Sequence, residues 1–164
     1  MTITKPTLSL SIYIVISSLF MQQLWQILEG ILGKNLLNIL LVALSFASTI
    51  VVLRIKIKNG QPARKMILIL AVCLVTVVFA WRQPYLQERA HVLEFSLLGW
   101  LARRDLDKKE TASQKKHLLS LVFVAGTGVL EEAFQKLLPW RVFDIRDIVT
   151  DILSGLLGII LYAA

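Results

Sequence analysis

The chain has 164 residues, of which 56% are hydrophobic and 18% are charged, and its formal net charge is +7. A soluble domain of this size needs more charged residues to cover its surface, so the composition excludes an ordinary soluble domain and favours a membrane protein. The basic residues lie at the ends of apolar runs. The sequence has no basic stripe with interleaved aromatic residues, so it does not indicate a nucleic-acid partner. The predicted fold is all-α, a polytopic transmembrane helical bundle of about six spans.

The N-terminal 65 residues are predicted to form a pair of spans joined to a basic cytoplasmic loop. The apolar stretch from Leu8 to Met21 follows Lys5 as a signal peptide would, but no small-x-small cleavage site comes after it, and the candidate span continues to Leu28. We therefore interpret it as an uncleaved first span, with three glutamines at its far end. The run from Leu36 to Leu53 carries no charge and is the clearest span, since crossing the hydrocarbon core takes about 20 apolar residues.

Residues 66–164 are predicted to form a helical domain of four further spans, several of them interrupted by acids. Their bounds are Met66 to Trp81, Pro84 to Ala102, His117 to Leu138 and Asp147 to Ala164. Asp147 suits a capping role, because acids stabilise a helix N-terminus. Small residues let helices approach closely in lipid, so we expect a packing seam at Ser154, Gly155 and Gly158, with Gly126 and Gly128 in a similar role. The single cysteine, Cys73, allows no internal disulfide.

Two loops rich in Lys and Arg, residues 54–65 and 103–116, are predicted to be cytoplasmic. Counting spans from these loops places both termini in the cytoplasm of a multi-pass protein of the cell membrane. The same topology brings polar residues from the last three spans to the outer face. Glu88, His91 and Glu94 follow one another at i, i+3, so they share one side of a helix.

This convergence predicts a shared site. The candidate catalytic residues are Glu88, His91, Glu94, Glu131, Glu132 and Gln135, and the candidate ligand-binding residues are Arg141, Asp144, Asp147 and Asp151. A histidine flanked by carboxylates suits proton transfer, and an arginine binds phosphate or carboxylate bidentately. Three alternatives stay open. The cluster is a structural network, a metal site built on the Glu-x-x-His pair, or an ion relay. No cofactor, metal or oligomeric state follows from the sequence.

Two stretches resemble the signatures of VanZ-like integral membrane proteins. The first is the run from Glu88 to Phe95, followed by Leu98 and Gly99. The second, similar in order and spacing, consists of Glu131, Glu132, Gln135, Pro139, Arg141, Asp144, Asp147, Gly155 and Gly158. The resemblance covers about residues 84–160. The chain departs from the pattern where Phe95 replaces the usual tyrosine, Glu131 the commoner aspartate and Asp151 the usual asparagine.

The resemblance implies a link to the cell envelope, because the founding member of the family is associated with resistance to the glycopeptide teicoplanin. We hypothesise that the site recognises an anionic envelope lipid or precursor headgroup through Arg141 and the acid–histidine network. The runner-up is a membrane-embedded enzyme that modifies or hydrolyses a lipid headgroup. Membrane lipids are the expected partners in either case.

Overall fold

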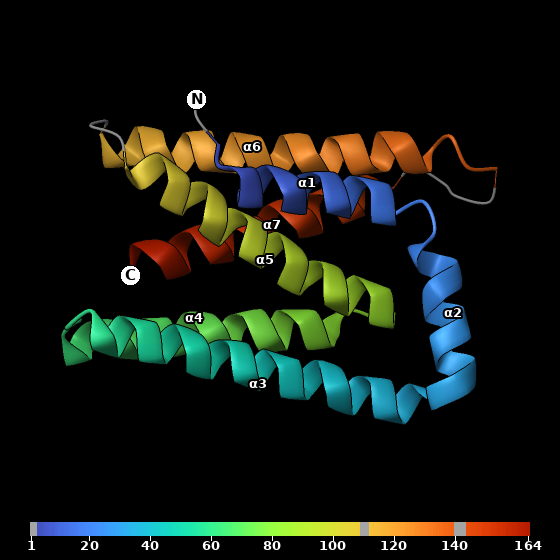
Figure 1. The fold of residues 1–164 in the computed structure, drawn as a ribbon, viewed down its shortest axis with the longest axis horizontal. Coiled ribbons are helices and arrows are strands. Elements are labelled where there is room, and N and C mark those ends of the chain that lie inside the picture. Colours follow the sequence, from blue (N-terminus) through green and yellow to red (C-terminus); the bar gives the residue numbers. More distant parts are fainter. Residues whose placement is uncertain (1–2, 109–111, 140–143) are drawn as a thin grey trace.

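The computed structural model describes residues 3–108, 112–139 and 144–164. Across these residues the chain folds into seven helices and no strand, which confirms the all-α class (Figure 1). The helices are α1 (Lys5–Ser17), α2 (Met21–Leu32), α3 (Lys34–Lys58), α4 (Ala63–Arg82), α5 (Leu86–Asp107), α6 (Ser113–Gln135) and α7 (Ile145–Ala163).

Three of these helices, α3, α4 and α6, are long and apolar enough to cross a membrane. The bent pair of α1 and α2 would add a fourth crossing. Large apolar side chains point out of the bundle from these helices, among them Ile39, Phe46 and Leu74, each more than 60% exposed. Apolar surface of this extent is unfavourable in water but is well solvated by lipid tails, so the fold is that of a membrane protein.

The first apolar run does not form the single helix that was predicted for Leu8 to Leu28. The chain breaks after Ser17, and α2 is bent by 76° from α1. At the break, the hydroxyls of Ser17 and Ser18 donate to the carbonyls of Ile14 and Val15. The prediction was wrong because the glutamines at the end of the run belong to a separate amphipathic helix. In Figure 1 α2 runs across one end of the bundle and joins α1 to α3.

The N-terminal helix α1 packs against the later helices α5 and α6. Its start is held by the buried carboxylate of Asp105 on α5. Asp105 Oδ2 accepts hydrogen bonds from the Thr4 N–H at 2.9 Å, the Thr4 hydroxyl at 2.7 Å and the Thr7 hydroxyl at 2.5 Å. Farther along, the hydroxyls of Ser11 and Thr127 lie 3.0 Å apart. The N-terminal segment therefore packs on the motif-bearing helices, while the division into two units at residue 65 stays a prediction.

The closest helix contact joins α5 to α7 along small residues, which confirms the predicted packing seam. The Ser96 hydroxyl donates to the Ser154 carbonyl at 3.0 Å. A methyl group at Gly158 would collide with the backbone of Ser96, and one at Gly99 would collide with the backbone of Gly155. Only glycine fits where two helix backbones approach this closely.

The two glycines predicted for a similar role on α6 differ from each other. Gly128 faces the side chain of Asp151, whose Oδ2 lies 3.1 Å from an added Cβ. Gly126 has open space around the position of an added Cβ, so its assignment to a packing seam was wrong. The two residues are two positions apart, and on a helix such neighbours do not share a face.

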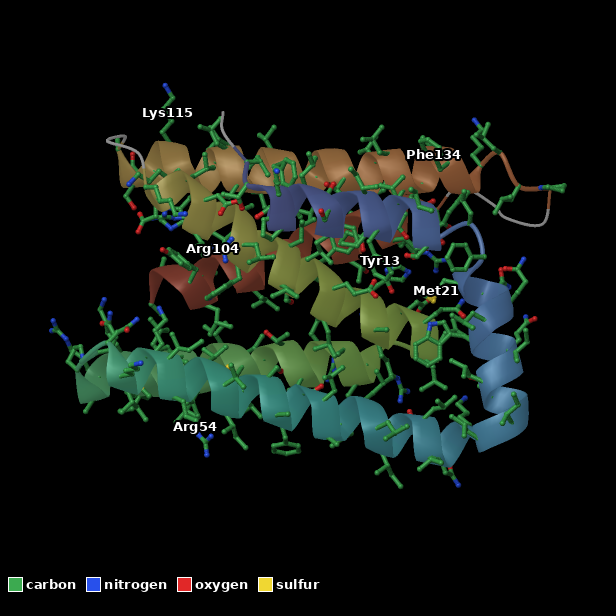
Figure 2. The ribbon with its side chains drawn as sticks, in the orientation of Figure 1. Tyr13, Met21, Arg54, Arg104, Lys115 and Phe134 are labelled. Carbon is green, nitrogen blue, oxygen red and sulfur yellow. The ribbon has the colours of Figure 1, made fainter. Side chains whose placement is uncertain are left out.

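Both chain ends lie at one end of the bundle in Figure 1, together with the turn between α3 and α4 and the start of α6. Arg104 and Lys115 lie toward this end in Figure 2, whereas Phe134 and Met21 lie toward the other. The opposite end carries α2, the start of α5, the end of α6 and the start of α7. Three motif-bearing segments that are distant in sequence thus meet at one end of the molecule.

Candidate acid–histidine pocket

His91, on the second turn of α5, lies between two carboxylates. Its Nδ1 is 3.2 Å from Glu94 Oε2, and its Nε2 is 3.5 Å from Glu131 Oε1. The Nδ1 contact lacks the direction of a hydrogen bond, although the distance is short. Glu94 reaches the ring because i, i+3 residues are neighbours on a helix surface. Phe95, fully buried beside His91, fills the position of the family's usual tyrosine with a ring centroid 6.4 Å from the imidazole.

The adjacent acids Glu131 and Glu132 on α6 are both buried but have different partners. Glu131 Oε1 accepts a hydrogen bond from Gln135 Nε2 at 3.0 Å, one helical turn later. Glu132 Oε2 accepts the backbone N–H of Asp144 at 3.0 Å, which ties the start of α7 to the end of α6. Successive residues on a helix point about 100° apart. Glu131 therefore faces His91, and Glu132 faces Asp144 at the N-cap of α7.

The first turns of α7 place two further acids against α5 and α6. Asp147 and Asp151 are separated by four residues and share a helix face. Asp151 is buried, with 6% of its surface exposed, and its carboxylate lies against the backbone of Gly128. A Cβ at Gly128 would lie 3.1 Å from Asp151 Oδ2, so a side chain there would press on this carboxylate.

Asp144, and not Asp147, caps α7, which corrects the capping role predicted from the sequence. Its Oδ1 accepts the N–H of Arg146 at 2.9 Å, and its two oxygens accept hydrogen bonds from the Arg146 guanidinium at 2.6 to 3.1 Å. These bonds hold the pKa of the Asp144 carboxyl below its usual value. The helix begins at Ile145, so Asp147 lies inside the first turn.

The polar side chains of the three segments surround a pocket. Its volume is about 40 Å³, compared with the 10 to 15 Å³ that one water molecule needs. It is lined by Gln83, Gln87, Glu88, His91, Glu131, Glu132, Gln135, Asp147, Thr150 and Asp151. The pocket as it stands accommodates a few water-sized groups.

Most of the residues predicted for the site line this pocket, and two more contact residues that line it. Glu94 contacts His91, and the backbone of Asp144 contacts Glu132. Arg141, the predicted anion-binding residue, lies outside the described residues. The structure therefore brings together the acids and the histidine that sequence spacing grouped, while their roles stay a prediction.

Three lining residues were not predicted: Gln83, Gln87 and Thr150. Gln87 lies four residues before His91, and Thr150 lies three residues after Asp147. Helical spacing could have identified both, because i, i+3 and i, i+4 neighbours share a face. Gln83 follows the end of α4, and only the packing of α4 against α5 brings it to the pocket.

Among the described residues, no three His, Cys, Asp or Glu side chains are arranged to hold a metal ion. The Glu88 and His91 pair was the sequence basis for a metal site, but the imidazole nitrogens face Glu94 and Glu131. A bundle metal site would need a second Glu-x-x-His pair. On α6 the corresponding pair is Glu132 and Gln135, and the amide of Gln135 is a weak ligand for transition metals.

A comparison with known families extends the similarity beyond the two motifs. A family model described as VanZ/LLP1 matches residues 6–164, from the first turn of α1 to the end of the chain. No curated protein and no solved structure matches. The match includes the N-terminal helices, for which the sequence offered no motif.

Proposed function

The chain belongs to the VanZ/LLP1 family. On that basis we propose that it is a multi-pass protein of the cell membrane. In this proposal it binds the headgroup of an envelope lipid or lipid-linked precursor. The observation that carries this proposal is the pocket between α5, α6 and α7, whose acids and histidine come from three segments. Ionisable groups inside membrane helices are costly, so a buried cluster of them is a functional-site candidate by default.

In this proposal the bundle has six spans, with α1 and α2 as a broken first span. The helices α5 and α7 have 22 and 19 residues. At 1.5 Å per residue they are about 33 and 28 Å long, which matches a hydrocarbon core of about 30 Å. Their polar residues are tolerated because α7 packs against α4, α5 and α6.

The proposed orientation places both termini in the cytoplasm. The basic turn between α3 and α4 and the basic end of α5 lie at the same end of the bundle as the termini, and positive residues favour the cytoplasmic side. The pocket lies toward the other end, at the level of lipid headgroups in the outer leaflet. Arg141, three residues before Asp144, is the proposed partner for a phosphate, because a guanidinium binds phosphate bidentately.

A second candidate is an enzyme that modifies or hydrolyses a headgroup, and one observation favours it. His91 lies between two carboxylates, the arrangement of a general acid–base. Against it, Thr150 is the one hydroxyl among the described residues that line the pocket, and none of them is a thiol. Such an enzyme would use water as its nucleophile. Incubating the protein with a lipid and finding no released product, while the lipid binds, would favour the binding role.

The test is thermal unfolding of the purified protein in detergent, with and without total lipid extract from a bacterial envelope. We expect lipid to raise the unfolding temperature of wild type and to have less effect on His91→Gln. The matched control is His117→Gln, at the start of α6 and the opposite end of the bundle, where the lipid effect should be unchanged. An equal lipid effect in all three proteins would refute a headgroup site at this pocket.

The link to glycopeptides is tested in cells. We propose that headgroup binding changes the access of teicoplanin to its target, so expression of the wild-type chain in a sensitive host should raise the inhibitory concentration. Glu132→Gln, which alters a buried lining residue, should abolish the effect at equal membrane abundance. An unchanged inhibitory concentration with wild type would refute the glycopeptide part of the proposal and leave lipid binding untouched.

A further inference from the structure

Glu131, which lines the pocket, has one carboxylate oxygen without a hydrogen-bond donor among the described residues. Glu131 is 3% exposed, and its partners His91 and Gln135 both contact Oε1. Glu131 Oε2 is buried and accepts no hydrogen bond from the described residues. Buried polar atoms are nearly always paired, so this carboxylate oxygen calls for a donor that the described residues do not supply.

The charges around this oxygen are complementary to a cation. Five carboxyl groups and one imidazole line the pocket, and no Lys or Arg is among its described lining residues. The nearby arginines have other partners: the Arg89 guanidinium donates to Asn38 Oδ1 at 2.7 Å and to the Gln83 carbonyl at 3.0 Å, and Arg146 binds Asp144. A positive group in the pocket would offset the repulsion among these carboxylates.

The size and arrangement of the pocket select the kind of cation. A volume of about 40 Å³ holds about three water-sized groups, so a small charged group fits in it. A metal ion needs several ligands at a fixed short distance, and the described residues offer no such set. A primary ammonium has three N–H donors on a small sphere, and it suits dispersed carboxylate and amide acceptors.

We propose that this pocket binds the primary ammonium group of an amine-bearing headgroup, with Glu131 Oε2 as one acceptor. The inference rests on the proposed headgroup function, since it names the part of the headgroup that enters the pocket. A phosphate on the same headgroup would lie outside the pocket. An ethanolamine headgroup has this pattern, whereas a choline headgroup ends in a bulkier trimethylammonium that has no N–H donor for Glu131 Oε2.

The experiment titrates water-soluble short-chain lipids into the detergent-solubilised protein and follows tryptophan fluorescence. Ethanolamine, choline and glycerol headgroups on the same phosphate and chains are compared with free ethanolamine. We expect the ethanolamine lipid to bind about tenfold more tightly than the other two, the ratio that one lost charge-assisted hydrogen bond produces.

Two variants assign the effect to the pocket. Glu131→Gln should weaken ethanolamine-lipid binding about tenfold, while Glu29→Gln, at an exposed acid on α2, should leave it unchanged. Asp151→Asn introduces the residue that is usual in the resembling family and is expected to retain the fold. It should weaken the same binding, and it decides the question if Glu131→Gln fails to fold, as judged by helical circular dichroism.

The outcomes separate this inference from the proposed function. If the three lipids bind equally and Glu131→Gln has no effect, the headgroup function stands and the ammonium proposal is overturned. If free ethanolamine binds in a Glu131-dependent way and no lipid binds, the ammonium site stands and the headgroup function falls. If nothing binds, both are overturned.

Discussion

Replacing Gly158 by alanine tests whether the contact between α5 and α7 is as close as the structure has it. The added methyl would overlap the Ser96 carbonyl oxygen and lie 2.7 Å from Ser96 C and 2.9 Å from Trp100 N. Favourable contacts between carbon atoms begin at about 3.5 Å. All three obstacles are backbone atoms of α5, so no side-chain rotation relieves the conflict and the two helices must separate.

The magnitude follows from two opposing effects. Overpacking of a close contact costs about 1 to 3 kcal/mol, whereas alanine is favoured over glycine in a helix interior by about 1 kcal/mol. Gly126→Ala is the matched control, because nothing lies within 4 Å of a Cβ at that position. It should be neutral or slightly stabilising. The difference between the two variants isolates the steric effect, which we expect at about 1 to 3 kcal/mol.

The stability of Gly155→Ala should lie between those of Gly158→Ala and Gly126→Ala. A methyl group there would collide with Val124, whose side chain can change its rotamer at a smaller cost than moving a helix backbone. The assay is equilibrium unfolding in mixed micelles by added SDS, followed by circular dichroism. Equal midpoints for Gly158→Ala and Gly126→Ala would show that α5 and α7 are not in backbone contact, and the reasoning would fail.

Three further predictions concern polar contacts. Asp105→Ala should destabilise the protein by about 1 to 3 kcal/mol in the same SDS assay, because the buried donors that it binds lose their acceptor, and an unchanged midpoint would contradict that docking role. A double-mutant cycle of Ser11→Ala and Thr127→Ala should give a coupling of about 0.6 kcal/mol, the average for such bonds between membrane helices, and additive effects would mean that the bond is absent. The lowered pKa of Asp144 means that its stabilising effect is present above the usual aspartate pKa and is lost as the pH falls through the lowered value. Asp144→Asn should therefore be less stable than wild type at pH 7, and the difference should shrink as the pH falls below the usual aspartate pKa, whereas a difference that does not change with pH would show that the charge is not responsible.

The sequence was sufficient to predict the all-α class, the helices after the first apolar run, and the group of acids. Apolar runs free of charge, such as residues 36–53, form helices in lipid because the backbone must satisfy its hydrogen bonds internally. The i, i+3 and i, i+4 spacings identified residues that meet at one pocket: Glu88 with His91, Glu131 and Glu132 with Gln135, and Asp147 with Asp151. This succeeded because helical periodicity is a local rule that needs no knowledge of packing.

What depended on contacts between distant segments was decided only by the tertiary structure. The docking of Thr4 and Thr7 on Asp105 depends on the position of α5, about 100 residues away along the chain. The same holds for the pocket. Nothing local to Glu131 says that one of its oxygens has two partners and the other has none, because those partners are fixed by how α5 and α6 pack.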